Sequence, residues 1–221
     1  MGKRTKRGGS PAPEFDASFI KVLPYGEAVR RRPSMYLGPE RRQAVLVAPA
    51  ALEPFFAKGA QCTRMEVSWT SAGVVQLLDD DWSVGTEPDA RGKTDIESIL
   101  VSLHAPGTNR RGADLSLVNL MSEWLRLEAH QPARRYRQHF ELGQPRPPET
   151  GVATPPWRTV ITFKPDARCV DASTPLTAEA LIQECLRRLD MWRPQLKGEE
   201  WPDLSFESAG SKVVIKRASS R

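Results

Sequence analysis

The feature that most constrains the fold is the alternation of short strand-like runs with helical runs along the chain. RMEVSWTS and GVVQLLDD, joined by Ser71-Ala72-Gly73, indicate a hairpin. RRYRQHFEL and WRTVITFKP indicate further strands, and DLSFES and KVVIKR a last, short pair. Apolar residues recur at helical spacing in residues 25–32, within 43–58, in KTDIESILVSLHA and in LTAEALIQECLRRLDMW. Because many strands are hairpin neighbours, we expect an α+β fold: a two-layer sandwich of a mixed sheet with helices on one face.

Capping and breaking residues predict where these elements begin and end. Pro33 is expected to end the first helix, and Thr94 to cap the helix that follows it. Thr174 or Thr177 is expected to cap the last helix, whose apolar face contains Ile182, Cys185, Leu186 and Leu189. GADLSLVNLMSEWLRLEAH reads as a helix to about Ser122 that runs on into a strand. GQPRPPETGVATPP is expected to be a Pro-rich connection outside the core.

Composition places the chain among soluble globular proteins. It has 221 residues, of which 39% are hydrophobic and 27% charged. No apolar run approaches the roughly 18 to 20 residues of a membrane span, and the first ten residues lack the apolar core of a secretory signal. Cys62, Cys169 and Cys185 are far apart and form no CxxC motif, which favours a reduced, cytoplasmic setting.

The net charge of +5 is concentrated at the two ends of the chain. The basic residues there are Lys3, Arg4, Lys6 and Arg7 at the start, and Lys212, Lys216, Arg217 and Arg221 at the end. Residues 11–207 therefore carry about −3. The ends are interpreted as solvated tails or as weak contacts to a nucleic-acid phosphate backbone. We expect residues 1–17 to be a disordered basic arm, 18–217 a single domain and 218–221 a tail.

One stretch resembles a known family. DASFIKVLPYGEAVRRRPSMYLG is similar to the start of the ATPase domain found in the B subunits of DNA gyrase and topoisomerase IV, with matches at Ala28, Val29, Arg30, Arg32, Pro33, Met35, Tyr36 and Gly38. SILVSLHAPGT, GADLSLVNLMSEWLRLE and WRTVITFKPD resemble later family segments in the same order. The resemblance spans roughly residues 18–217 and implies a Bergerat-type (GHKL) fold, here in a degenerate version.

The family's first site motif is a helix with E-x-x-x-N, whose Glu is the general base and whose Asn holds Mg²⁺. The matching stretch, RRQAVLVAPAALEPFFAKG, contains no Asn, and its only acid is Glu53. Glu53 lies several residues beyond the expected base and is expected to be a surface or helix-end carboxylate. Pro49 and Pro54 are expected to interrupt the helix. The resemblance thus implies that the general base and the magnesium ligand are missing.

The adenine side of the family site is partly matched. Asp79 corresponds to the Asp that accepts a hydrogen bond from the adenine amino group, and Thr159 to a supporting Thr on a late strand. Asp81 and Ser83 replace the glycines after that Asp. Trp82, between them, is expected to plug the vacated pocket, and stacking on a base is the alternative.

The family's Gly-rich lid is short in this sequence. Within HAPGTNRRGADLSL only Gly112 matches. Asp114, at the start of the next helix, would repel a phosphate. Arg110 and Arg111 are expected to be solvated, with contact to phosphate as the alternative. No other catalytic set is evident, because His104, His130 and His139 are dispersed and no metal-ligand spacing is present.

Three functions remain open. The expected one is a catalytically inactive pseudo-ATPase domain that serves as a protein-interaction or regulatory module, with a protein partner or a second copy of itself. The second is an adenine-nucleotide sensor that uses Asp79 and Thr159 without hydrolysis. The third is an accessory factor of a type II DNA topoisomerase or of DNA. No enzyme activity, no cofactor (ATP and Mg²⁺ included), no metal site and no membrane contact are expected.

Overall fold

The structure is a computed structural model, and it describes residues 25–56, 62–80, 85–103, 112–132, 134–153, 155–156, 158–193 and 202–218. The helices are α1 (Tyr25–Arg31), α2 (Ser34–Leu37), α3 (Gln43–Phe56), α4 (Asp95–Val101), α5 (Gly112–Leu120) and α6 (Ala178–Trp192). The strands are β1 (Arg64–Trp69), β2 (Val75–Asp79), β3 (Ser122–His130), β4 (Arg135–Glu141), β5 (Gln144–Pro145), β6 (Glu149–Gly151), β7 (Arg158–Pro165), β8 (Leu204–Ser208) and β9 (Lys212–Arg217).

The strands form one sheet in the order β5-β4-β3-β7-β2-β1-β9-β8, with β6 paired to β4. Every strand pairing in the described part of the chain is antiparallel, whereas a mixed sheet was expected. The reason is that successive strands such as β1–β2, β3–β4 and β8–β9 are hairpin partners, and β7 enters between β3 and β2 antiparallel to both.

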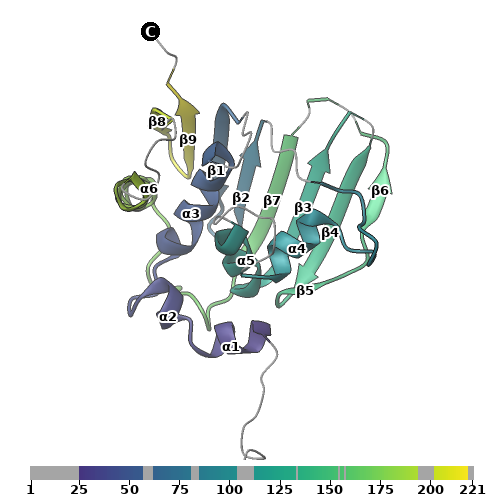
Figure 1. Cartoon of the computed structure of the whole chain (residues 1–221). Helices are drawn as coiled ribbons and strands as arrows, with labels where there is room; N and C mark the ends of the chain where they lie inside the picture. Colours follow the sequence, from purple (N-terminus) through teal and green to yellow (C-terminus); the bar gives the residue numbers. More distant parts are fainter. Residues whose placement is uncertain are drawn as a thin grey trace, which may run out of the picture.

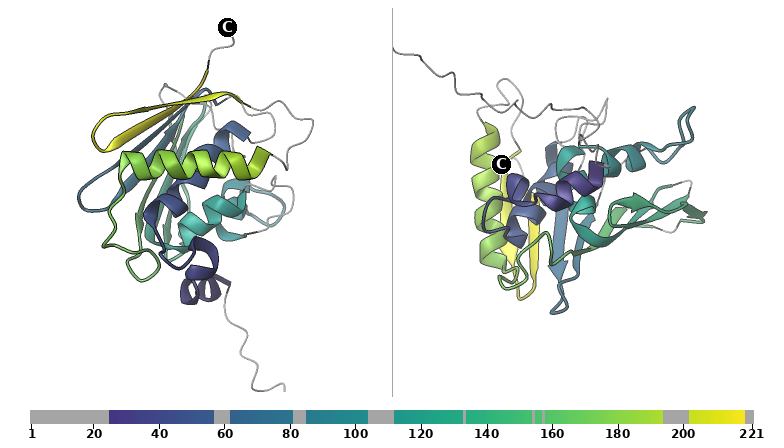
Figure 2. Two further views of the ribbon diagram at one scale, coloured as in Figure 1. Left: turned by 90° about the vertical axis from the view of Figure 1, so that its left-hand side faces the viewer. Right: turned by 90° about the horizontal axis from the view of Figure 1, so that it is seen from below.

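The helices lie on one side of the sheet and so complete the expected two-layer α+β sandwich (Figures 1 and 2). The inner face of the sheet carries the core, because side chains of alternate residues point to the same face. Leu127, Ile161, Leu77 and Val67 are in register across β3, β7, β2 and β1, and all are buried. The opposite, outer face of the sheet has no described helix over it (Figure 2).

Helix α3 is continuous, so the expectation that Pro49 and Pro54 interrupt it is wrong. Each proline removes one intrahelical hydrogen bond. Burial of the helix offsets that cost, since every residue from Ala44 to Phe56 is buried and the helix contacts α6, α5 and β1. Tertiary packing therefore prevails over local propensity here.

Helix α6 begins where one of the two proposed caps predicted it would. The Thr177 Oγ1 accepts a hydrogen bond from the Ala180 N–H at 3.2 Å. Its buried stripe, however, follows Leu181, Cys185 and Leu189 at spacings of one turn. Leu186, predicted to lie on this face, is 42% exposed because it is about 100° further round the helix than Cys185.

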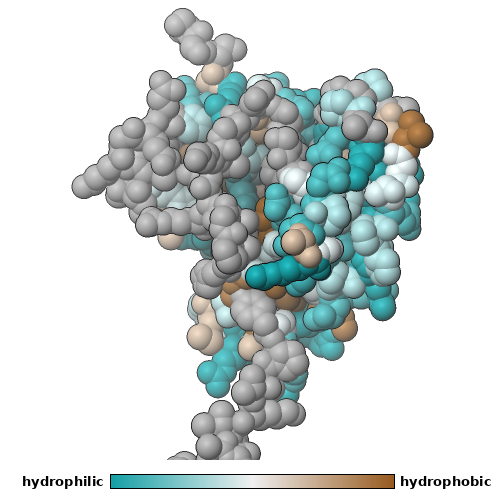
Figure 3. Space-filling view, turned by 45° about the vertical axis from the view of Figure 1, so that its right-hand side comes forward, coloured by the Kyte–Doolittle hydropathy of each residue, from teal (hydrophilic) through white to brown (hydrophobic). Residues whose placement is uncertain are grey.

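The segment expected to be a Pro-rich connection contains the two short strands β5 and β6, which both pair with β4. The short pairings leave its Pro-rich middle outside the sheet. On the side of β4, β5 and β6, the described surface is mostly hydrophilic with small hydrophobic patches (Figure 3). Among the described helices, none combines the length and apolarity that crossing a membrane requires.

Candidate functional site

Asp79 and Thr159 lie directly opposite each other in the sheet. Asp79 ends β2, Thr159 is the second residue of β7, and the two are Cα partners in the antiparallel register. Both point to the inner face, as Leu77 and Ile161 do, and each is only 2% exposed. The structure thus brings together the two residues predicted for the adenine side of a nucleotide site; their role in binding stays a prediction.

The chain next to Asp79 is held by its neighbour Asp80. The carboxylate of Asp80 accepts hydrogen bonds from the backbone N–H groups of Thr63 and Arg64, both at 3.0 Å. Burial acts to raise the pKa of Asp80, but these bonds and one from the Thr63 hydroxyl hold it below its usual value. The start of β1 and the end of β2 are therefore tied together beside the Asp79–Thr159 pair.

Cys62 lies close to the same carboxylates. Burial, followed by the charges of Asp79 and Asp80, raises the pKa of the Cys62 thiol. A thiolate is disfavoured in such a setting, so Cys62 is unsuited to act as a nucleophile. Cys62, Cys169 and Cys185 are all free and buried.

The helix that corresponds to the family's E-x-x-x-N motif is α3. It is strongly apolar and buried on every side from Ala44 onward. Of the two expectations for Glu53, a helix-end carboxylate is confirmed, because the residue lies in the last turn of α3, and a surface carboxylate is wrong, because it is 5% exposed. Glu53 is held in the interior by the same packing that buries the apolar residues on either side of it.

A magnesium nucleotide does not fit the side chains of α3. Between Gln43 and Glu53 the helix carries only Ala, Val, Leu and Pro, which offer no side-chain oxygen to Mg²⁺. Within the described residues, no three or more His, Cys, Asp or Glu side chains gather where they could hold a metal ion. The two residues predicted for the adenine side are thus register partners, and the helix that corresponds to the family's magnesium-binding motif is apolar from Ala44 to Leu52.

Other residues singled out from the sequence lie outside the described part of the chain. These are Trp82, the predicted plug, Arg110 and Arg111 of the short lid, and Lys3, Arg4, Lys6 and Arg7 of the basic arm. Helix α5 begins at Gly112, the glycine that matches the family lid. The roles expected for the residues outside the described ranges stay predictions.

The segment that first suggested the family is tied to the sheet by Arg30. Its Nη1 donates hydrogen bonds to the carbonyls of Leu120 and Ser122, at 2.8 and 3.0 Å, and its Nη2 to the carboxylate of Asp166. The Arg30 and Asp166 side chains are 14% and 4% exposed. This junction joins α1 to the end of α5 and to the residue after β7. Arg30 and Asp166 lie in the family-like motifs AVRRRP and FKPD, but the sequence alone does not indicate that these two residues are in contact.

Asp166 also receives the Arg168 guanidinium, whose Nε and Nη2 lie 3.0 and 2.7 Å from its carboxylate oxygens. These hydrogen bonds, together with the charge of Arg30, lower the pKa of Asp166 to about 2 against the effect of burial. The carboxylate is therefore ionised throughout the physiological range, and the junction is a charged one.

Three cavities of about 420, 470 and 480 Å³ occur among the described residues. One lies beside α1 and includes Arg30 and Arg168, one lies on the outer face of the sheet over β3 and β4, and one lies beside the start of α6. Asp79 and Thr159 line none of the three.

The sequence is similar to the B subunits of bacterial type II topoisomerases. It is 31% identical to the DNA gyrase B subunit of Myxococcus xanthus over 98% of this chain, and 28% identical to that of Thermotoga maritima over 84%. It is 30% identical to the DNA topoisomerase 4 B subunit of Staphylococcus aureus over 76%. The chain spans less than a third of each relative's length, namely 27%, 31% and 28%.

No protein-family model matches the chain. The similarity to the gyrase and topoisomerase 4 proteins nevertheless covers most of its residues, and the two-layer α+β fold with Arg30 and its segment joined to the sheet agrees with it. The chain therefore belongs to the GHKL-type ATPase-domain family of type II topoisomerase B subunits.

Proposed function

We propose that this chain is a catalytically inactive, gyrase-B-like domain that acts as a protein-interaction or regulatory module. Hydrolysis of ATP requires an aligned water, a general base and a cation that neutralises the phosphates. The proposal rests on α3, because the helix that should supply the base and the magnesium ligand is buried from Ala44 to Phe56, is apolar from Ala44 to Leu52 and has Glu53 as its only acid.

The burial of α3 supports closure of the phosphate side of the site. A helix that is hydrophobic on all faces is stable only when protein surrounds it. Ala48, Ala51 and Leu52, on the middle turns of α3, are each fully buried. Opening a nucleotide pocket along this helix would expose that apolar surface to water or to phosphate charge, both of which are unfavourable.

The test is release of phosphate from ATP by the purified chain with Mg²⁺, compared with the variant Asp79→Asn. We expect no phosphate release that depends on Asp79. Residual turnover by a contaminating enzyme would be the same in both preparations. Turnover that Asp79→Asn abolishes would overturn the proposal. A parallel measurement of molar mass in solution tests for a homodimer, the partner that needs no second protein.

A second candidate is a nucleotide sensor that binds adenine without hydrolysis. The register that places Asp79 opposite Thr159 favours it, since an adenine amino group could donate to the carboxylate there. A sensor of this kind would bind adenosine and ATP with similar affinity, with no effect of Mg²⁺, and the Asp79→Asn variant would lose both. Failure of all adenine compounds to bind would exclude the sensor.

The third candidate is an accessory factor of a type II topoisomerase or of DNA. The similarity to DNA gyrase and topoisomerase 4 subunits and the basic ends of the chain support it. If Lys3, Arg4, Lys6 and Arg7 contact phosphates, binding to DNA should weaken steeply with salt. Changing these four residues to Ala should remove that dependence, and an unchanged salt slope would exclude the arm as the contact.

A further inference from the structure

The outer face of the sheet carries a row of aromatic and charged side chains. Over β3, β4 and β7 these are Trp124, Arg126, Glu128 and His130, then Arg135, Arg137, His139 and Glu141, and finally Arg158, Val160, Thr162 and Lys164. No described helix lies over this face (Figure 2). We define the surface formed by these residues as the outer strip.

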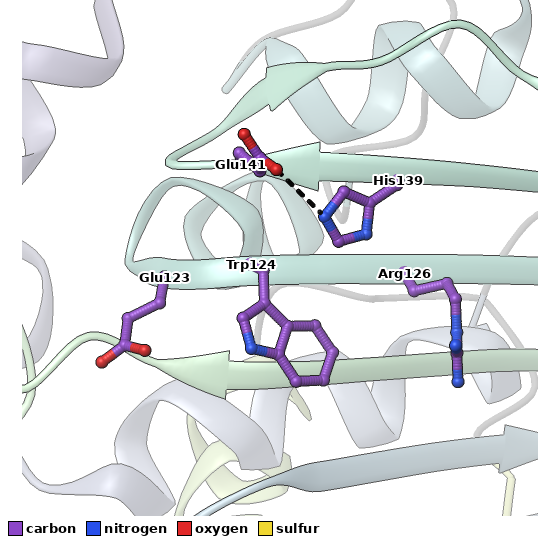
Figure 4. Close-up of a pocket in the computed structure, with 5 residues that line it drawn as sticks. All are labelled: Glu123, Trp124, Arg126, His139 and Glu141. Carbon is purple, nitrogen blue, oxygen red and sulfur yellow. Dashed lines mark ion pairs between the residues drawn. The ribbon is translucent and has the colours of Figure 1, made fainter.

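One end of the outer strip presents aromatic rings. The rings of Trp124 and His139 are nearly parallel, with centroids 6.4 Å apart and an interplanar angle of 22°. They line a cavity of about 470 Å³ together with Glu123, Arg126 and Glu141 (Figure 4). Flat rings that are open to solvent can stack on an unpaired nucleobase.

The carboxylates at this end are already neutralised. Glu123 lies 2.8 Å from Lys164. Glu141 pairs with Arg146 and lies 3.7 Å from His139 (Figure 4). The aromatic end of the outer strip is therefore close to neutral and does not repel a phosphate chain that passes over it.

The other end of the outer strip is basic. Arg126 and Arg137 each lie 3.3 Å from the carboxylate of Glu128, and His130 lies 3.8 Å from it. Arg135 and Arg158 flank His130 on the adjacent strands, and the described residues offer neither of them an ion pair. Glu128 thus pairs with Arg126 and Arg137, whereas Arg135 and Arg158 lie beside His130, and the exposed Glu149 adds one contact at 3.7 Å from Arg137.

Buried donors at the basic end lack partners within the described structure. The Nε atoms of Arg137 and Arg158 are buried without a hydrogen bond, and so is the Nδ1 of His130. Burying such groups unpaired is costly, and a native protein usually gives them a partner. Because these atoms are buried, a ligand with oxygen acceptors over β3, β4 and β7 would pair with them only after the side chains turn outward.

The length of the outer strip indicates the size of the ligand. Trp124 is level with Lys164 of β7, and Arg158 is six residues away on the same strand. At about 3.3 Å per residue this separation is about 20 Å, which exceeds a single nucleotide. Successive phosphates of an oligonucleotide could follow the arginines while a base stacks on Trp124.

We propose that the outer strip binds single-stranded nucleic acid, with Trp124 and His139 as the stacking platform and Arg126, Arg135, Arg137 and Arg158 as phosphate contacts. A duplex is excluded by this chemistry, because paired bases do not expose their faces to a ring on a sheet. The strip is on the opposite face of the sheet from Asp79 and Thr159, so it is independent of the proposed pseudo-ATPase function.

The experiment is fluorescence anisotropy of the full chain with labelled oligo(dT) of about 12 nucleotides, oligo(rU) of the same length and a matched duplex. We expect a Kd of roughly 1–100 µM for one or both single strands and much weaker binding of the duplex. Comparison of oligo(dT) with oligo(rU) shows whether the outer strip prefers single-stranded DNA or single-stranded RNA.

Two sets of variants test the aromatic end and the basic end of the outer strip. Trp124→Ala should weaken binding roughly 5- to 150-fold, while Trp124→Phe, which keeps a ring, should restore most of it. Arg137→Ala combined with Arg158→Ala should reduce the slope of log affinity against log salt by about 1.4. The control Arg91→Ala, in the exposed loop before α4, removes one charge elsewhere and should leave the Trp124-dependent binding intact.

Several results would overturn the proposal. One is absence of binding to both single strands at high protein concentration and low salt. Another is binding that Trp124→Ala changes no more than Arg91→Ala does. Equal affinity for the duplex would also contradict the stacking role. Circular dichroism melts of each variant guard against misfolding, and Arg126→Gln provides a second variant at a partly exposed residue that both pairs with Glu128 and lines the cavity beside Trp124.

Discussion

The Arg30–Asp166 junction and helix α3 differ sharply in what they keep of the family's pattern. Arg30 lies within a long match to the family, and its guanidinium joins two backbone carbonyls and a carboxylate from distant parts of the chain. Helix α3 occupies the place of the E-x-x-x-N motif, yet it is buried from Ala44 to Phe56 and is apolar apart from Gln43 and Glu53. The first region builds the scaffold, and the second is where the family's chemistry would reside.

The difference indicates that the two regions serve separable purposes. A junction such as Arg30–Asp166 positions α1 against the sheet whether or not a nucleotide binds. An apolar stretch from Ala44 to Leu52 strengthens the core and offers no side-chain oxygen to a cation, which leaves the buried Glu53 as the only acid of the helix. A chain that keeps the Arg30–Asp166 junction but lacks the polar residues of the E-x-x-x-N motif can retain the fold and its surfaces while losing hydrolysis. This separation is the basis of the proposed function.

The largest effect is expected at the junction. Arg30→Ala removes one of the two arginines that pair with Asp166 and also leaves the carbonyls of Leu120 and Ser122 without their charged donor, and we expect a loss of about 3–5 kcal/mol in the free energy of unfolding. Urea denaturation measures it. The control is Arg31→Ala, whose i,i+4 pair with Glu27 is half exposed, and for which a loss of about 0.5 kcal/mol or less is expected. Equal losses would show that the junction does not hold the scaffold.

A somewhat smaller effect is expected in α3. Leu52 is fully buried, so Leu52→Asn removes apolar contacts and buries an amide, at an expected cost of about 3 kcal/mol. The same change at Leu186 of α6, which is 42% exposed, should cost less than about 0.5 kcal/mol. If α3 instead lined an open, hydrated pocket, Leu52→Asn would be tolerated, and thermal melts of both variants decide between these possibilities.

The pH dependence of stability is expected to show the charge of the junction. The pKa of Asp166 is about 2 in the folded state, below its ordinary value of 3.8, so the unfolded chain binds the proton more readily. Stability from this group is present above about pH 4 and is lost as pH falls through 2. The stability difference between wild type and Asp166→Asn should shrink by on the order of 1–2 kcal/mol in that window. A constant difference would mean that the ion pair adds no stability.

Local signals predicted most of the elements. The cap at Thr94, whose hydroxyl accepts the Glu97 N–H at 3.1 Å, follows from residue type and helical spacing, and so does the β1–β2 hairpin. The meeting of Asp79 and Thr159 was also predictable, but only through the family resemblance. Such features depend on residues near one another in sequence or on a known pattern.

Features that depend on distant packing were not predictable in the same way. The prolines of α3 signalled a break, and only its burial against α6, α5 and β1 explains why the helix continues. Glu53 looked like a surface residue because its neighbours across the fold are not visible in the sequence. The partners of Arg30 are 90 to 136 residues away, a separation that no local rule bridges.

The most direct test of the proposed loss of function is titration calorimetry of the full chain with a non-hydrolysable ATP analogue, with and without Mg²⁺. We predict no Mg²⁺-dependent binding at millimolar nucleotide, because α3 has no Asn and carries only apolar side chains from Ala44 to Leu52. Binding that ignores Mg²⁺ and disappears in Asp79→Asn would establish the sensor instead. Tight binding that requires Mg²⁺ would contradict the closure of the phosphate side of the nucleotide site. It would indicate that the chain binds nucleotide as an active ATPase domain does.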